Sequence, residues 1–218
     1  MIPAFPVYLF DVDGTLLDSA ADICGAMGSA LQELALEQPC SEAFLRGYIG
    51  LHLRDLIRDL LPNHTPDQFD AFLNHYRSLY VGRQHGSTRA FPGVAEALSC
   101  LPGRKSTATT KQTATTRAVL EQFGLLRYFD HVQGTDGFPA KPAPDVVFKS
   151  LEIFGVPPED CLLVGDAAAD MEAGRRAGVR LCAVTYGYGD RAKIAAWQPD
   201  YWIDDLRELC AAVPASSR

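Results

Sequence analysis

The chain has 218 residues, of which 47% are hydrophobic and 22% charged, and its formal net charge is −7. This size and composition suit a globular protein of one or two domains with a substantial buried core. The negative charge argues against nucleic acid and anionic membranes as partners, because both bind basic faces. No apolar run approaches the ~18 residues of a membrane span, and the N-terminus lacks the basic region of a secretory signal. We expect a cytoplasmic protein, either a monomer or a homodimer.

The cysteines support the same expectation. Six of them are scattered along the chain without a C-x-x-C pair or any paired spacing. This pattern argues against a cysteine metal site and against a disulfide framework, as is typical of cytoplasmic proteins.

The first apolar run, 7–10, predicts a buried strand that ends at Asp11. After it come helical patterns only, at 20–35, 42–49, 53–61 and 66–80. Thr65-Pro66-Asp67-Gln68 has the form of a capping box at the start of the last one. An all-helical block inserted after the first strand predicts a second domain, which we place at residues 18–88. The remaining segments, 1–17 and 89–218, form the predicted core domain.

From about residue 90 onward, short strand-like runs alternate with helical patterns. Strands are expected at 106–109, 131–134, 161–164, 181–184 and 201–203, and helices at 113–123, 144–154 and 171–177. This alternation predicts a parallel sheet with helices on both faces, a doubly wound, Rossmann-like α/β fold. The run 106–109 is unusual because it contains no Val, Ile or Leu.

Four polar motifs are each expected at the carboxyl end of a predicted strand. They are Asp11-Val12-Asp13-Gly14-Thr15, Thr109-Thr110-Lys111, Lys141-Pro142, and the segment from Gly165-Asp166 to Asp170. In open α/β sheets ligands bind at the carboxyl edge, so the aspartates of these motifs should converge there. Two like charges 4 Å apart cost about 4 kcal/mol at an effective dielectric constant near 20. A Mg²⁺ ion would relieve that repulsion and attract a phosphate group.

The chemistry of the individual side chains fits phosphoryl transfer. Asp11 can attack phosphorus, and Asp13 can protonate the leaving oxygen and later deprotonate a water molecule. Lys141 offers a charge to phosphate and nucleophile. Thr109 offers a hydroxyl, and the N–H of Thr110 is expected at a helix N-terminus, where anions are favoured.

Together these motifs resemble the haloacid dehalogenase superfamily, specifically its phosphoglycolate phosphatase-like branch with a helical cap inserted after the first motif. The matching segments are DVDGTLLDS, ATTK, AKPAPDVV and VGDAAADMEAG, and the resemblance spans essentially the whole chain. It implies that Asp11 is the nucleophile and a metal ligand, and that Asp13 is the acid/base and gives its carbonyl to the metal. It further implies that Asp166 is a metal ligand and that Asp170 orients waters or Lys141.

Simpler interpretations remain open for several of these residues. Asp166 and Asp170 could be the N-cap and a first-turn acid of the next helix, and Thr109 could be only a strand residue. Asp18 and Asp22 are interpreted as helix-start acids outside the site. In the cap segment RGYIGLHLRDLI, three residues could meet a substrate carboxylate: Arg46, His52 and Arg54. Each arginine fits a solvated helix face equally well.

The leading functional hypothesis is a Mg²⁺-dependent phosphatase that hydrolyses a small phosphomonoester, first 2-phosphoglycolate, through an aspartyl-phosphate. A sugar-phosphate phosphatase or a β-phosphoglucomutase-like phosphotransferase is the alternative on the same fold. The mutases tend to carry a histidine in the first cap helix where this chain has Ile23. Asp13 opposes a dehalogenase. Outside this class stand a phospho-receiver domain and a catalytically silent binding protein.

Overall fold

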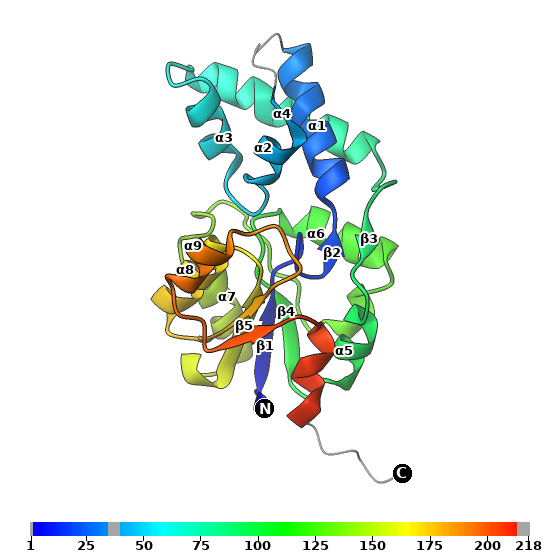
Figure 1. The fold of residues 1–218 in the computed structure, drawn as a ribbon, viewed down its shortest axis with the longest axis vertical. Helices are drawn as coiled ribbons and strands as arrows, with labels where there is room; N and C mark the ends of the chain where they lie inside the picture. The colour runs from blue at the N-terminus through cyan, green and yellow to red at the C-terminus, as the bar shows by residue number, and fades with distance from the viewer. Residues whose placement is uncertain (1, 35–39, 213–218) are drawn as a thin grey trace.

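A computed structural model describes residues 2–34 and 40–212. Five strands form one parallel sheet in the order β4-β1-β5-β6-β7. Their bounds are Val7–Phe10 (β1), Arg104–Thr107 (β4), Cys161–Gly165 (β5), Arg180–Val184 (β6) and Tyr201–Ile203 (β7). The predicted α/β fold class is confirmed (Figure 1).

Helices cover both faces of the sheet because its strands are apolar on both sides. Tyr8 and Phe10 of β1 belong to one hydrophobic cluster, and Val7 and Leu9 belong to another. The first cluster is completed by α5 (Val94–Cys100), α6 (Thr113–Gln122) and the 3₁₀ segments η1 (Leu126–Tyr128) and η3 (Leu206–Ala212). The second is completed by α7 (Asp145–Phe154), α8 (Ala168–Ala177) and α9 (Arg191–Ala195), with η2 (Pro158–Asp160) leading into β5.

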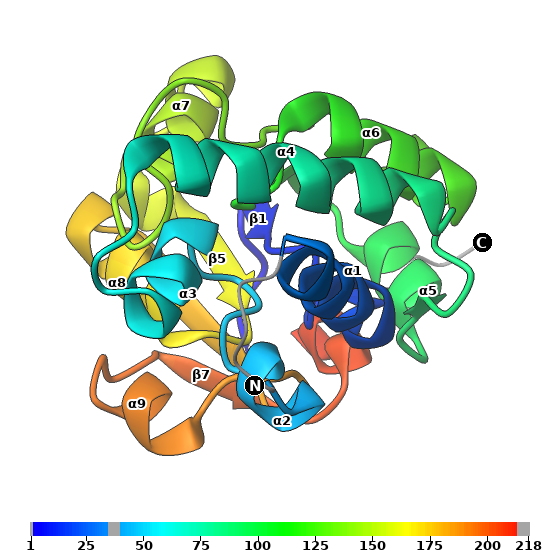
Figure 2. The ribbon, with the colours of Figure 1, turned by 90° about the horizontal axis from the view of Figure 1, so that it is seen from above.

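Four further helices lie beyond the carboxyl ends of the strands and are called the cap helices below (Figure 1). They are α1 (Ala20–Glu33), α2 (Glu42–Arg46), α3 (Leu53–Leu60) and α4 (Pro66–Gly82). Seen from above, α4 crosses the top of the molecule beside α1 (Figure 2), and the two helices pack together. The cap helices bury their own hydrophobic cluster, and the predicted capping box between Thr65 and Gln68 is confirmed.

A two-stranded antiparallel ribbon joins the two connections between the cap helices and the sheet. It pairs β2 (Leu17–Asp18) with β3 (Arg89–Ala90), and neither strand is apparent in the sequence pattern. Next to it the buried Asp22 accepts hydrogen bonds from the Thr88 hydroxyl (2.8 Å) and the Ser87 N–H (3.0 Å). These bonds tie the first turn of α1 to the returning chain. The domain limits at 17/18 and 88/89 stay a prediction.

The polar strand β4 lies at the edge of the sheet, and its side chains find partners locally. Lys105 donates to the carbonyls of Leu101 and Gly103 (both 2.8 Å). The Thr107 hydroxyl donates to the Gln133 carbonyl and accepts from the Gln133 N–H (both 2.9 Å). The strand predicted at 131–134 was wrong, because the backbone of this segment makes one hydrogen bond to β4, from the His131 N–H to the Lys105 carbonyl (3.2 Å), and its other bonds to β4 go to the Thr107 side chain.

Two other predictions need correction. Pro144, expected inside α7, is its N-cap. The expectation of no disulfide was wrong, because Cys100 and Cys210 are paired, with their Cα atoms 6.0 Å apart. These cysteines are 110 residues apart in sequence and meet only because α5 packs against η3. Since disulfides are rare in cytosolic proteins, this pair weakens the argument for a cytoplasmic location. Within the described residues, no helix has the length and apolar character needed to cross a membrane.

Candidate active site

Three buried carboxylates meet at the carboxyl ends of β1 and β5. Asp11 directly follows β1 and donates its N–H to the Val164 carbonyl (2.9 Å), which fixes it beside β5. Asp166 follows β5, and Asp170 lies in the first turn of α8. Carboxylate oxygens of the three residues all lie within 4.8 Å of one another, and none of the residues is more than 3% exposed. The acids from the first and fourth motifs therefore form one cluster.

Lys141 supplies the positive charge inside this cluster. Its ammonium group donates to Asp11 Oδ1 (2.7 Å), to the Ala108 carbonyl (2.7 Å) and to Asp170 Oδ1. An ammonium has three donors, so all of them are used and the side chain is held in one position. Burial alone would lower the pKa of Lys141, but Asp11 and Asp170 raise it above its ordinary value. Lys141 is therefore charged.

The cluster holds three carboxyl groups and one ammonium group. Burial raises the pKa of Asp11 to about 7, opposed by Lys141 and reinforced by Asp170. Burial, followed by the charges of Asp11 and Asp170, raises the pKa of Asp166 well above its ordinary value. Three carboxylates face one lysine in a site that excludes water, and a hard divalent cation with oxygen ligands would balance them. The residues present therefore fit Mg²⁺.

At position 14, which lies against Asp166, no residue larger than glycine fits. Gly14 has φ +92°, and a Cβ there would lie 2.3 Å from Asp166 Oδ2. Asp166 accepts hydrogen bonds from the Thr15 hydroxyl (3.2 Å) and the Tyr188 N–H (2.7 Å). The turn after β1 can therefore pass directly against Asp166.

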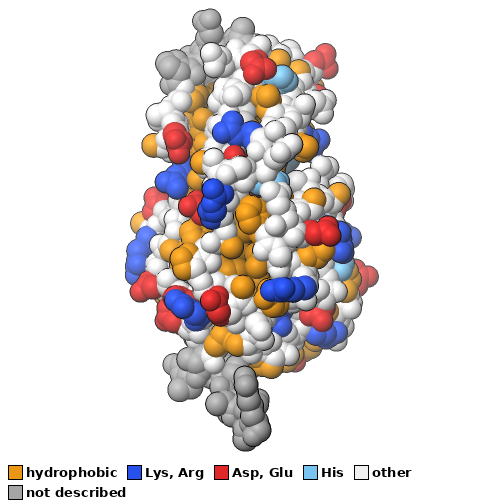
Figure 3. Space-filling view, turned by 90° about the vertical axis from the view of Figure 1, so that its right-hand side faces the viewer, with side chains coloured by type: hydrophobic (Ala, Val, Ile, Leu, Met, Phe, Trp, Pro, Cys, Tyr) orange, Lys and Arg blue, Asp and Glu red, His pale blue; other side chains and the backbone are white. Residues whose placement is uncertain are grey.

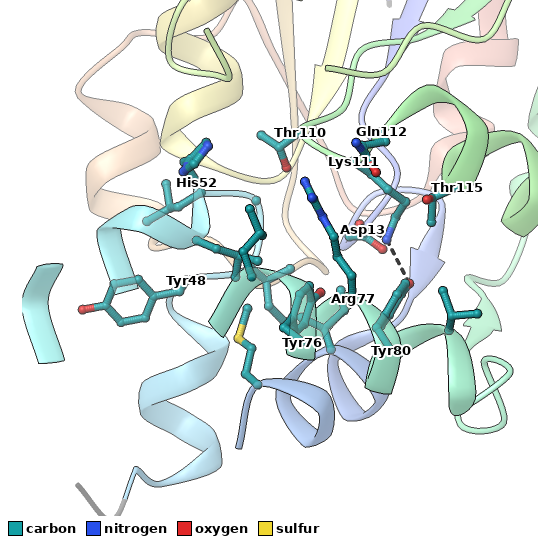
Figure 4. A pocket seen from close by; sticks show the side chains of 18 residues that line it. Asp13, Tyr48, His52, Tyr76, Arg77, Tyr80, Thr110, Lys111, Gln112 and Thr115 are labelled. Carbon is teal, nitrogen blue, oxygen red and sulfur yellow. Dashed lines mark hydrogen bonds and ion pairs between the residues drawn. The ribbon is translucent and has the colours of Figure 1, made fainter. Parts of the chain in front are cut away.

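Asp13 points away from the acid cluster, toward the cap helices. Its Oδ1 accepts from the Ser19 hydroxyl (2.7 Å), and its Oδ2 lies 3.2 Å from Lys111 Nζ. Lys111 also donates to the Tyr80 hydroxyl (2.8 Å) and lies over the Tyr80 ring (4.4 Å to its centroid). Figure 4 shows this Asp13–Lys111–Tyr80 group at one end of a cavity.

The cavity lies between the cap helices and the sheet and has a volume of about 260 Å³. Its walls come from α1, from the loop before α3, from α4, and from the segment around Lys111. Most of the cap side is apolar, with Ile23, Met27, Ile49, Leu51, Leu53, Leu73 and Val81. The cavity thus opens directly onto Asp13 (Figure 4).

The three cap residues named from the sequence have different positions. His52 lines the cavity. Arg46 and Arg54 do not, because Arg46 lies over the Tyr188 ring (4.9 Å) and Arg54 over the Phe69 ring (4.1 Å). Two cations that do line it, Arg77 and Lys111, were missed. Lys111 directly follows the second motif, which was a usable signal, whereas Arg77 is one of several polar residues in a helical pattern.

The other predicted residues of the second and fourth motifs are placed as follows. The buried Thr109 accepts from the Lys111 N–H (3.3 Å), and Thr110 lines the cavity. The helix N-terminus expected at Thr110 was wrong, because α6 begins at Thr113. Asp170 Oδ2 accepts from the N–H of Ala167 (2.9 Å), the N-cap of α8, so Asp170 is also a first-turn acid.

Known proteins share this fold over nearly its whole length. A haloacid dehalogenase-like hydrolase family protein from Streptococcus pneumoniae has a solved structure that superposes with a TM-score of 0.84 at 28% identity, covering 95% of this chain and 97% of that one. The family model "Haloacid dehalogenase-like hydrolase" matches residues 8–184. The chain belongs to this family. The family predicted from the four motifs is confirmed.

Two curated relatives in the family are similar from end to end. The phosphoglycolate phosphatase of Aquifex aeolicus is 35% identical over 93% of this chain and 94% of its own length. The phosphoglycolate phosphatase of Nitrosospira multiformis is 33% identical over 96% of both chains. This chain and each of the two relatives therefore match over more than nine tenths of their lengths.

The surface drawn in Figure 3 carries basic and acidic side chains interspersed with one another. Among the side chains shown there, no extended region of one sign gathers. Inside the molecule, Lys141 and Lys111 are each paired with aspartates.

Proposed function

We propose that this hydrolase releases phosphate from a small phosphomonoester, with Asp11 as the nucleophile and 2-phosphoglycolate as the first candidate substrate. Its enzyme class, a phosphoric monoester hydrolase, follows from the family and from the relatives of Aquifex and Nitrosospira. The observation that carries the proposed chemistry is the position of Asp11. It lies beside Lys141 within a buried acid cluster, at the strand edge where Asp13 meets the cavity.

In the proposed reaction the two aspartates of the first motif have separate tasks. A carboxylate oxygen of Asp11 attacks phosphorus, the bond from phosphorus to the ester oxygen breaks, and Asp13 gives that oxygen its proton. Asp13 then takes a proton from water, whose oxygen attacks phosphorus. The bond between phosphorus and Asp11 breaks, and inorganic phosphate leaves with Asp11 restored.

The surrounding residues hold these groups in place. Lys141 orients Asp11 and favours its ionised form, and Asp170 holds Lys141 in place. Thr109 and Thr110 are proposed to contact the phosphate group. Asp11, Asp166 and the carbonyl of Asp13 are proposed to hold Mg²⁺, with Asp170 orienting the site. When bound, Mg²⁺ would neutralise charge on the phosphate and on the nucleophile.

We also propose that residues 18–88 form a cap that closes over the substrate during transfer and excludes water. The cavity between the cap helices and the sheet supports this proposal. A β-phosphoglucomutase-like activity is less well supported, because the apolar Ile23 lines the cavity where those enzymes tend to carry a histidine.

A panel of phosphomonoesters with Mg²⁺ tests the proposal. The purified protein should release phosphate from 2-phosphoglycolate and from other small esters, and Asp11→Asn should release none. The proposal fails if the wild-type protein leaves the whole panel intact, or if Asp11→Asn retains the activity of the wild-type protein.

A further inference from the structure

The cavity beyond Asp13 has an unequal distribution of charge. Of the 18 residues that line it, Asp13 is acidic, and Arg77 and Lys111 are basic. His52 also lines it, but burial lowers the pKa of His52, so its ring is neutral. The two basic side chains outnumber the one acid, and they differ in burial, because the Lys111 side chain is 9% exposed and Arg77 is exposed to solvent.

The two cations are held in different ways. Lys111 comes from the segment after β4 and is fixed between Asp13 and Tyr80, with its side chain only 9% exposed. Arg77 comes from the cap helix α4 and extends toward Thr110 and Lys111 (Figure 4). Among the described residues, no side chain forms a hydrogen bond or ion pair with Arg77. Its guanidinium group is therefore free to bind a ligand.

The positions of Arg77 and Lys111 indicate which chemical group the leaving group carries. We propose that Arg77 and Lys111 together bind a carboxylate on the leaving group of the substrate, and that Arg77 is the residue that selects for it. The inference rests on the proposed phosphatase activity. The leaving oxygen departs next to Asp13, so the rest of the leaving group must occupy the cavity that these two cations share.

Geometry and size agree with this assignment. The guanidinium group of arginine pairs with a carboxylate through two parallel hydrogen bonds, while the ammonium group of lysine provides a point charge. The volume of about 260 Å³ lies just below the roughly 300–1,000 Å³ of sites for drug-sized ligands, which favours a leaving group of few carbons. Apart from Asp13, no acid lines the cavity to bind the hydroxyls of a sugar.

The assignment also links recognition to the cap. Arg77 belongs to a cap helix and Lys111 to the sheet domain, so a carboxylate that binds both joins the two parts. A substrate without the carboxylate loses that link. Replacing Arg77 should therefore reduce discrimination between substrates with and without a carboxylate, and should leave the protein folded.

Two matched esters test the inference: 2-phosphoglycolate, and 2-hydroxyethyl phosphate, which has a CH₂OH group in place of the carboxylate. The measured quantity is the ratio of their kcat/KM values. Arg77→Gln should lower that ratio by roughly ten- to a hundredfold, mainly through a higher KM for 2-phosphoglycolate, because a hydrogen bond to a charged group is lost. Arg77→Lys should recover part of it. Arg54→Gln, which changes a cap arginine outside the cavity, should keep the wild-type ratio.

The outcomes separate this inference from the proposed function. If the wild-type protein hydrolyses neither these esters nor the panel, the proposed function fails and the inference fails with it. If the wild-type protein hydrolyses esters but Arg77→Gln keeps the ratio within about twofold, or lowers both kcat/KM values equally, only the inference is wrong. Unfolding curves of each variant confirm that the fold is retained.

Discussion

Asp11 and Asp13 are two residues apart and face different surroundings. Asp11 faces Lys141 and the acid cluster, whereas Asp13 faces Ser19 and Lys111. Gly14, which follows both, has a positive φ and lies directly against Asp166. Each of the two carboxylates therefore has its own lysine partner, which offsets the repulsion between them.

The acid cluster predicts how metal binding depends on pH. The pKa of Asp11 is raised from its ordinary value to about 7, and the pKa of Asp166 is also raised. In the metal-free protein the folded state holds these protons more tightly than the unfolded chain. The stability they contribute is therefore lost as the pH rises from about 4 to about 7. Mg²⁺ binds the ionised form and should raise the unfolding temperature more at pH 8 than at pH 5.

Thermal unfolding with Mg²⁺ and with a chelator, at both pH values, measures this difference. Asp166→Asn provides the matched control, because it removes one proposed ligand and should reduce the Mg²⁺ effect at pH 8. An equal increase in unfolding temperature at both pH values would contradict the proposed site.

At the scale of elements, helix α1 begins without a capping hydrogen bond from the side chain of its own N-cap residue. Ser19 is the N-cap of α1, but its hydroxyl donates to Asp13 instead of accepting from the helix. The Tyr188 hydroxyl replaces it, accepting from the N–H groups of Ser19 (2.7 Å) and Ala20 (3.1 Å). The N–H of the same tyrosine donates to Asp166. One loop residue after β6 therefore joins the acid cluster to the start of the cap.

Tyr188→Phe should expose those two N–H groups. We expect faster hydrogen exchange at the amides of Ser19 and Ala20 and a loss of about 1 kcal/mol in the free energy of unfolding. Tyr186→Phe is the control, since the Tyr186 hydroxyl donates to the Thr15 carbonyl and does not touch α1. Wild-type protection of both amides in Tyr188→Phe would show that Tyr188 does not cap α1.

The elements that the sequence predicts well are those whose own residues determine them. The apolar runs of β1, β5, β6 and β7 can only be buried, and glycine or proline marks the ends of several helices. The segment 131–134 was mistaken for a strand because only one of its backbone groups bonds the backbone of β4, and Gln133 bonds the Thr107 side chain instead. The β2–β3 ribbon was missed because each strand has two residues and pairs across about 70 positions.

Across the whole molecule, the candidate site combines residues that motifs reveal with residues that only the fold brings together. Asp11, Lys141 and Asp166 belong to motifs at or near strand ends, and the parallel sheet explains why they meet. Arg77 belongs to no such motif, and its position depends on how α4 crosses above the sheet (Figure 2). The cavity could not be predicted from the sequence for the same reason. Its walls come from five separate stretches of the chain.

The account depends most on Asp11 as the residue that carries the phosphoryl group. Asp13→Asn should slow its hydrolysis, because this variant lacks the group proposed to deprotonate water. The decisive measurement is mass spectrometry of the acid-quenched Asp13→Asn protein after mixing with Mg²⁺ and 2-phosphoglycolate. We predict a phosphate adduct that proteolysis locates at Asp11 and that the Asp11→Asn variant lacks. Phosphate release without an adduct at Asp11, or an adduct that persists in Asp11→Asn, would contradict the account.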